Sequence, residues 1–335
     1  MKALNGIKVI ELAGLAPVPF CGQILADFGA SVTLVSKNGV GIEQKLLRGK
    51  TQITMDYKKD FGKLRSMIIN SDVLLDPFRP GVLEAIGLDP IKLMEENEKL
   101  IVARITGYGQ TGELSNAPGH DINYVALSGL LPTIAGYNRK PYWPPANLLA
   151  DFAGGSLTTA FGIVAALVQR NSNGGKGAII DTSMTEGLAY LGSFISAYRD
   201  NDMLWDHEFA AFTGTCPIYR TYETKDGKFM SVGALEPKFN KRLFEKLEIK
   251  ADFSDIASNP QEIVDKTEKA FKSKTHEEAC VTPVLDHFEV GELQQHKDRN
   301  AFTKTDGKWL PNPAPKIYSA KEFEELKEKN KKSKL

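Results

Sequence analysis

The first half of the chain alternates short apolar runs with amphipathic segments, and this alternation restricts the possible folds more than any other feature of the sequence. Strands that are separated by helices pair in parallel, because the chain crosses over the sheet before each new strand begins. We therefore predict an α/β fold with a mostly parallel sheet and helices on both of its faces. The predicted strands cover residues 7–12, 31–35, 52–55, 72–75 and 100–106, and the helices between them cover 20–28, 61–69 and 91–96.

A second region begins near Pro217, where the pattern changes. Two alternating runs, 219–224 and 229–232, are joined through Asp226-Gly227, which is a hairpin signal. Lysine-rich helical segments follow them. We predict a large α/β domain over residues 1–200 and a small α+β domain over 215–300, and we expect the segment from about 305 to 335 to return to the large domain.

Further elements of the large domain are expected as helices at 121–131, 152–169 and 184–198 and as a buried strand at 178–181.

The overall charge argues against two classes of partner. Lys plus Arg and Asp plus Glu both number 42, so the formal charge is zero, and this balance favours neither nucleic acid nor a membrane surface. We expect no signal peptide and no run that approaches the length of a transmembrane helix. Three distant cysteines, Cys21, Cys216 and Cys280, favour neither a disulfide framework nor a zinc site, and they indicate a reducing compartment.

The chain ends in Ser333-Lys334-Leu335, the tripeptide that the peroxisomal import receptor reads as an address. A specified tripeptide at one fixed position arises by chance in roughly one chain in several thousand at average residue usage. We therefore expect the peroxisome as the location of the protein and the import receptor as a partner.

A Gly-x-Gly-x-x-Gly match at residues 107–112 follows a predicted strand and invites a dinucleotide-binding interpretation. That fingerprint needs an apolar helix directly after its third glycine. Residues 113–118 are instead polar and end in Pro118. The sequence also contains neither a phosphate-binding loop nor a Gly-x-Ser-x-Gly nucleophile elbow. Hydride transfer, phosphoryl transfer and serine hydrolysis therefore lose support.

Two residues that can exchange protons, His120 and Asp151, stand at the starts of two separate helical segments. Inversion of a carbon centre is easiest with one group on each face of the carbon, one that removes the proton and one that returns it. The pair therefore points to proton chemistry next to a carbonyl. A simple role for either residue in capping its helix remains open. If Asp151 caps a helix that begins at Phe152, the free N–H groups in the first turn of that helix would form an oxyanion site. Gly154-Gly155 would then let a substrate approach the backbone.

Further motifs lie along nearly the whole chain. They are residues 12–17, 25–30, 78–82, 107–112, 119–124, 147–152, Asp181, 232–237 and 279–284. Together they resemble the α-methylacyl-CoA racemases of the family III CoA-transferase superfamily. The resemblance implies an interlocked homodimer, in which each active site lies between the large domain of one subunit and the small domain of the other.

The resemblance also implies roles for particular residues. His120 and Asp151 match the two bases of the racemases, and Glu236, in Ala234-Leu235-Glu236-Pro237, is expected to pair with the histidine. An arginine at the edge of an open α/β sheet also suits a phosphate of CoA. No metal or redox cofactor is expected, because CoA is part of the substrate and the thioester itself acidifies the reacting carbon. The residues expected to hold the CoA part are Lys37, Met55, Asp56, Tyr57, Lys58, Arg79, Gly119, Asp121, Ile122, Asn123 and Tyr124.

The function that follows is the interconversion of (2R)- and (2S)-2-methylacyl-CoA thioesters by two-base proton exchange through an enolate, in branched-chain fatty acid or sterol side-chain metabolism. The alternatives are a CoA-transferase in which Asp151 is the nucleophile, and an acyl-CoA-binding homologue without activity. His120 argues against the transferase, because that position is typically aromatic in the transferase branch. Three departures from the racemases affect the small domain: segment 209–217 lacks their Asp-Gly-Gly-Ala-Pro, residues 273–279 are shorter, and the C-terminus ends early.

Overall fold

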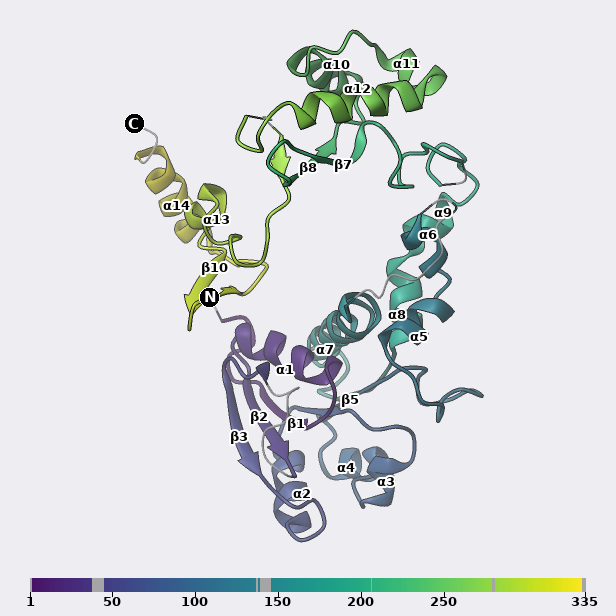
Figure 1. The fold of residues 1–335 in the computed structure, drawn as a ribbon. Coiled ribbons are helices and arrows are strands. Elements are labelled where there is room, and N and C mark those ends of the chain that lie inside the picture. The colour runs from purple at the N-terminus through teal and green to yellow at the C-terminus, as the bar shows by residue number, and fades with distance from the viewer. Residues whose placement is uncertain are drawn as a thin grey trace. The chain divides into compact units, whose positions relative to one another are not determined.

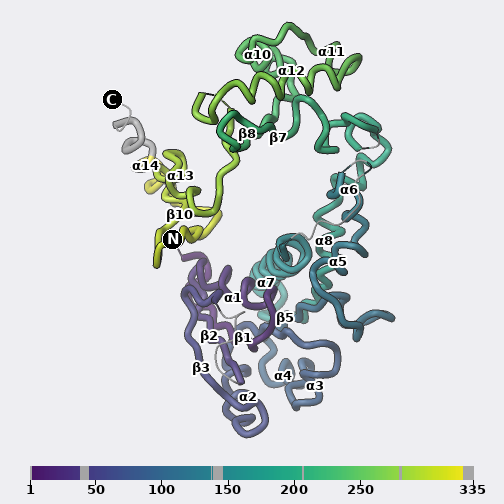
Figure 2. The backbone as a smooth tube through the Cα atoms, in the orientation of Figure 1, coloured from purple at the N-terminus to yellow at the C-terminus, as the bar shows by residue number. Residues whose placement is uncertain are grey.

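The computed structural model describes residues 2–37, 45–136, 138, 146–205, 207–278 and 281–332, with side chains up to residue 326 (Figures 1 and 2). Cys280 and the terminal tripeptide 333–335 lie outside the described residues. The chain divides into two compact units. The first unit comprises Met1–Gly129, Pro144–Gly192 and Pro313–Leu335, and the second comprises Leu130–Trp143 and Ser193–Asn312. Residues 130–143 and 193–200 group with the second unit in this division. The domain limits expected from the sequence remain a prediction.

The first unit is built on a six-stranded sheet in which every strand pair is parallel. The three central strands are buried almost throughout, which is the pattern of a parallel sheet covered on both faces. This confirms the predicted parallel sheet. In spatial order the strands are β3 (Lys50–Thr54), β2 (Ser31–Ser36), β1 (Lys8–Leu12), β4 (Val73–Asp76), β5 (Ile101–Thr106) and β6 (Ile179–Ser183).

Helices cover both faces of this sheet (Figure 1). α1 (Pro17–Asp27) and α7 (Thr158–Gln169) pack on one face, where α1 contacts β1 to β4 and α7 contacts β5 and β6. The other face carries α2 (Phe61–Ile69), α3 (Val82–Ala85) and α4 (Pro90–Glu96). Fully buried side chains such as Leu64 and Leu83 join Leu12 and Leu74 of the strands in one core on that side. The arrangement is a doubly wound α/β fold.

Three of the predicted helices have different limits in the structure. The segment predicted as 121–131 forms α5 (Asp121–Leu127) and then α6 (Leu131–Ala135) in the second unit, because Gly129 adopts φ +82° and ends the first helix. The segment 184–198 likewise divides into α8 (Met184–Leu191) and α9 (Ser193–Ala197). The helix predicted from Phe152 begins earlier, as the π-helix η2 (Leu148–Leu157), and continues into α7.

Helices η2 and α7 together form an apolar run of 22 residues, Leu148–Gln169. By length and composition alone the run could cross a membrane. The expectation that no apolar run approaches the length of a transmembrane helix is therefore wrong. Core helices meet the same two criteria. Here η2 contacts α1 and α8, and α7 contacts the sheet, which is the position of a core helix. One side of the run nevertheless remains exposed, with Phe161 75% accessible and Val168 63% accessible.

The second unit contains the predicted hairpin. β7 (Tyr219–Glu223) and β8 (Phe229–Gly233) pair antiparallel, and β9 (Thr282–Pro283) extends the sheet beside β8. The rings of Tyr222 and Phe271 stack in its core with centroids 5.2 Å apart. Its helices are α10 (Pro237–Lys246), α11 (Phe253–Ser258), α12 (Pro260–Lys272) and α13 (Gln294–Asp298), and a second hairpin pairs β10 (Phe302–Thr305) with β11 (Lys308–Pro311). The last helix, α14 (Ala320–Lys332), belongs to the first unit.

A buried ion pair fixes the start of α1 to the sheet. The side chains of Lys50 and Glu11 are both fully buried, and Lys50 Nζ donates to Glu11 Oε1 at 2.9 Å and to the carbonyl of Pro19 at 2.7 Å. A Cβ at Gly22 would collide with the Glu11 carboxylate, so glycine at this position leaves room for the ion pair beneath α1. Burial raises the pKa of Glu11 to about 7, and Lys50 opposes this shift.

Replacing Lys50 with Met should destabilise the protein in a pH-dependent manner. Removing one partner of a buried ion pair costs about 3–5 kcal/mol. The variant lacks the cation that holds down the pKa of Glu11, so this pKa rises further above its value in the unfolded chain. The folded variant then binds more protons than the unfolded one, and its stability is present at low pH and lost as the pH rises.

Urea unfolding at about pH 5 and about pH 8 measures this difference in the free energy of unfolding. Arg65→Met, which breaks the exposed Arg65–Glu96 pair, is the control and should change stability little. An equal loss for Lys50→Met at both pH values would contradict the account.

Candidate active site

A crevice of about 460 Å³ opens at the carboxyl ends of β1, β4 and β5. The strand order reverses between β1 and β4, and in open α/β sheets ligands bind at this switch point. The volume lies within the range of small-molecule sites. The residues that line the crevice are 14–18, 77–79, 105–107, Gly119, His120, Tyr124, Asn147, Asp151 and Met184.

The wall after β4 is held by a buried charge network. Arg104 Nε donates to Asp76 Oδ2 at 2.8 Å, and the backbone N–H of Phe78 donates to Asp76 Oδ1 at 2.8 Å. Arg104 also pairs with Glu84 at 2.7 Å. Burial is the main cause that raises the pKa of Asp76, to about 6. The network fixes the loop that presents Arg79, whose exposed guanidinium donates to the carbonyl of Asn116 at 3.2 Å.

His120 is the N-cap of α5 and has an extended backbone. Its N–H donates to Asn123 Oδ1 at 3.0 Å, and its side chain is exposed toward the crevice that it lines. Tyr124, one turn later, donates through its hydroxyl to the carbonyl of Gly119 at 2.5 Å. Side chains at Gly107 or Gly119 would collide with the Tyr124 ring, so these glycines let the ring close this side of the crevice.

The Gly-x-Gly-x-x-Gly match therefore has a different role from a dinucleotide site. Residues 107–120 form bends and turns, and the next helix is α5, so the helix that the fingerprint requires does not follow Gly112. Asp181 accepts the N–H of Gln110 at 3.1 Å and holds this loop to β6. This geometry gives no support to a dinucleotide site at residues 107–112.

Asp151 lies in the first turn of η2 and is 7% exposed. Burial and then the nearby Asp121 carboxylate raise its pKa to about 7. A carboxyl group with this pKa is present in both protonation states near neutral pH, which suits a general base. π-helical segments are rare and are often found at functional sites, so the local geometry points in the same direction.

The structure corrects two expectations about this helix start. Asp151 is not the N-cap, since that position belongs to Asn147. The N–H of Phe152 donates to the Asn147 carbonyl at 3.2 Å, and those of Ala150 and Asp151 donate to Asp121, so the donors expected to form an oxyanion site are occupied.

The glycines of η2 also have a different role from the expected one. Side chains at Gly154 or at Gly187 of α8 would collide with the backbone of the other helix. Gly154 therefore allows η2 and α8 to pack closely, and it does not open the backbone to a substrate.

The structure brings together some of the residues predicted to hold CoA. Arg79, Gly119 and Tyr124 line the crevice beside His120 and Asp151. Met55 is instead 4% exposed and belongs to the core, and Tyr57 donates to the Val35 carbonyl at 2.9 Å. The remaining members of the predicted set do not line the crevice, and their roles stay predictions: Lys37, Asp56, Lys58, Asp121, Ile122 and Asn123.

Glu236 lies in the second unit as the N-cap of α10, with an exposed side chain. Its pairing with His120 remains a prediction.

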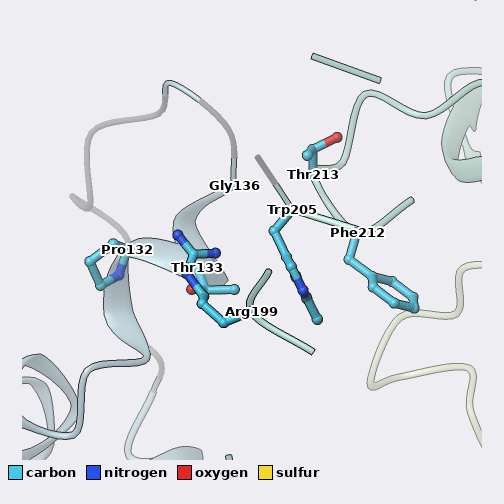
Figure 3. Close-up of a pocket in the computed structure, with 7 residues that line it drawn as sticks. All are labelled: Pro132, Thr133, Gly136, Arg199, Trp205, Phe212 and Thr213. Atoms are coloured by element: carbon cyan, nitrogen blue, oxygen red, sulfur yellow. The ribbon is translucent and has the colours of Figure 1, made fainter. Parts of the chain in front are cut away.

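The altered segment 209–217 forms an aromatic turn in the second unit. The ring centroid of Phe212 lies 5.2 Å from those of Trp205 and Tyr219. Thr213 Oγ1 donates to the Ala210 carbonyl at 2.8 Å. Trp205, Phe212 and Thr213 line a small cavity of about 160 Å³ together with Pro132, Thr133, Gly136 and Arg199 (Figure 3). The segment thus packs within its own unit despite lacking the racemase sequence.

Several residues that line the crevice were not predicted from the sequence. The loop 14–18, Gly107, Asn147 and Met184 all line it. Each except Asn147 lies directly after a strand of the parallel sheet, so strand order would have identified them. Asn147 follows no strand; in the structure it has a left-handed backbone with φ 60°, which asparagine tolerates well.

A crevice at the switch point of a doubly wound sheet, lined by an acid and a histidine, fits a site for a small molecule. Residues 4–308 match the CoA-transferase family III, so the chain belongs to this family of acyl-CoA-processing enzymes.

Individual relatives show the same similarity. The CaiB/baiF CoA-transferase family protein ZK892.4 of Caenorhabditis elegans is 53% identical over 98% of this chain and 99% of its own length. The alpha-methylacyl-CoA racemases of Mus musculus and Homo sapiens are 45% and 44% identical, over 93% of this chain and 85% and 86% of their lengths. A solved CAIB/BAIF family protein from Brucella suis has the same fold, with a TM-score of 0.75 at 23% identity over 97% of this chain and 99% of that chain.

Proposed function

We propose that this protein is a racemase that interconverts (2R)- and (2S)-2-methylacyl-CoA thioesters. The observation that carries the proposal is that His120 and Asp151, from two different helices, line one crevice at the switch point of the sheet. The 44–45% identity to proteins named alpha-methylacyl-CoA racemase supports it. We place the reaction in branched-chain fatty acid or sterol side-chain metabolism.

The reaction needs only proton transfers. For one enantiomer, the Asp151 carboxylate removes the α-proton, the electron pair of the C–H bond moves into the thioester as an enolate, and protonated His120 returns a proton to the opposite face. For the other enantiomer the two residues exchange roles. The pKa of about 7 for Asp151 lets it act in both directions near neutral pH. Glu236 is proposed to pair with the imidazole and to orient it.

The competing reaction is CoA transfer through a covalent intermediate on Asp151. Attack by a carboxylate and proton removal by a carboxylate both need the ionised form, so the pKa of Asp151 does not separate the two reactions. A histidine beside the acid adds nothing to carboxylate attack, but it supplies the second proton carrier that inversion requires. The histidine therefore favours proton exchange over transfer.

Variants of the two bases should have complementary effects on exchange of the α-proton with solvent. Asp151→Asn is nearly isosteric but has no basic oxygen, so it should abolish racemisation and retain exchange only from the face that His120 serves. His120→Ala should abolish racemisation and retain only slow exchange from the other face. Deuterium uptake into each enantiomer of a 2-methylacyl-CoA in heavy water measures both effects.

Racemisation of both enantiomers at the parental rate by either variant would refute the two-base assignment. CoA transfer to free acids by the parent protein, lost in Asp151→Asn, would support the transferase instead.

We further propose that the protein is an interlocked homodimer. An apolar stripe with spacings of four, three and four residues runs along η2 and α7, and it consists of Leu157, Phe161, Val164 and Val168. Exposed apolar patches of this kind mark contact surfaces. The stripe fits a second copy of the chain, because the family resemblance implies this partner.

The native mass should be twice 36.9 kDa in sedimentation equilibrium. Phe161→Glu should weaken association, because it buries a charge in the interface. Ile91→Glu, at an exposed apolar position outside the stripe, should leave it unchanged. A parent protein that sediments as a monomer would contradict the proposal, and binding to lipid vesicles through the stripe would favour a membrane contact instead.

The proposed location is the peroxisome, through receptor recognition of Ser333-Lys334-Leu335. Deleting these three residues should leave the protein in the cytosol with its racemase activity intact, because an address needs only an exposed end. Fluorescence microscopy in cells that lack a wild-type copy avoids import of the variant as a dimer with the wild-type chain. Peroxisomal location after the deletion would refute the assignment.

A further inference from the structure

We propose that Asp121 is a positioning residue for both bases: its carboxylate ties the first turn of η2, which carries Asp151, to the first turn of α5, which begins at His120. The effect on reaction rate rests on the proposed function, whereas the effect on Asp151 itself does not.

The contacts of Asp121 bridge two helix starts. Asp121 Oδ1 accepts the N–H of Ala150 at 2.8 Å and that of Asp151 at 2.9 Å. N–H groups in the first turn of a helix have no partner within the helix, and a carboxylate from another element satisfies two of them here. Such charge-assisted hydrogen bonds are among the stronger ones in proteins. Because Asp121 directly follows His120, the same side chain fixes the backbone of both bases.

The location of Asp121 makes a direct contact with CoA difficult. The residue is 2% exposed and does not line the crevice. The resemblance placed it among the CoA-binding residues, and the structure assigns its side chain to the protein interior.

The second carboxylate oxygen of Asp121 brings a negative charge to Asp151. Oδ2 is buried and has no hydrogen-bond partner among the described residues. The negative charge of Asp121 disfavours ionisation of the neighbouring Asp151. It is the second cause of the raised pKa of Asp151, after burial.

Other ionisable groups lie on the elements that pack against η2 and α5 or on the loops beside them, but none of them is among the causes of the pKa shift of Asp151. Burial and Asp121 are the causes of the pKa shift of Asp151. Arg79 and Tyr108 come from the loops after β4 and β5, His120 and Tyr124 from α5, Glu186 and Tyr190 from α8, Cys21 and Asp27 from α1, Arg104 from β5 and Asp181 from β6.

Two variants separate the charge of Asp121 from its position. Asp121→Asn retains an oxygen that accepts both N–H groups but removes the charge, so the pKa of Asp151 should fall by about one unit. Asp121→Glu retains the charge but adds a methylene group, so Asp151 should titrate near its parental pKa while α-proton exchange slows by about 100-fold for both enantiomers.

The decisive measurement is the titration of the Asp151 carboxyl carbon by NMR in aspartate-labelled full-length protein, with Asp151→Asn to assign the signal. In a plot of the exchange rate against pH, the midpoint on the acid side should shift in Asp121→Asn by the same amount as the pKa of Asp151. Asp89→Asn is the control, because Asp89 also caps a helix of the first unit, accepting from Ile91 N–H at 2.9 Å, but lies outside the crevice. Its titration curve and rate should match the parent.

An unchanged Asp151 titration in Asp121→Asn would overturn the proposal, and so would parental exchange rates in Asp121→Glu. If Asp121→Asn does not fold, Asp121→Glu decides through its rate and its titration. A parent protein without any α-proton exchange would refute the racemase proposal, but the titration comparison would still test the role of Asp121.

Discussion

Parallel pairing of β1, β4 and β5 brings the carboxyl ends of three strands to one edge of the sheet, and the active site depends on this constraint. The chain leaves β1 toward β2 on one side, while β4 pairs on the other, so the loops after β1 and β4 diverge and leave a crevice between them. The strands themselves contribute only Ile105 and Thr106 to the lining of the crevice. The two bases come from α5 and η2, which follow β5 in the chain, and their starts must be fixed to each other for a two-base reaction to work.

The starts of α5 and η2 are fixed by polar groups that the helices cannot satisfy internally. The N–H groups of Ala150 and Asp151 in the first turn of η2 need acceptors because both residues are buried, and Asp121 provides one oxygen for the two of them. Close packing through Gly154 and Gly187 holds the same helix against α8. These constraints act on backbone atoms, so the position of Asp151 is set by the fold before any substrate binds.

Much of the fold was predictable from the sequence because buried parallel strands appear as continuous apolar runs, and each predicted strand lies within two residues of the observed one. The positions of His120 and Asp151 on one crevice were predicted through the motifs. The break at Gly129 had a signal in the sequence, a glycine at a helix end. The start of η2 had none, because the apolar run 148–150 fits a strand or a helix equally well. The role of Asp121 depends on a contact across 30 residues, which local patterns do not contain.

Three buried acids lie near the carboxyl ends of the strands. The surroundings of two of them suit a structural role, and those of the third suit proton transfer. Glu11 is paired with Lys50, and Asp76 is paired with Arg104, so each charge has a cation at hydrogen-bonding distance inside the protein. Burial raises the pKa of both acids, but neither lines the crevice. Asp151 has the opposite arrangement, because it lines the crevice and its strongest charged neighbour is another carboxylate. An acid that gains a proton readily and faces a substrate site is suited to proton transfer, whereas an acid held by a buried cation is suited to fixing the loops around that site.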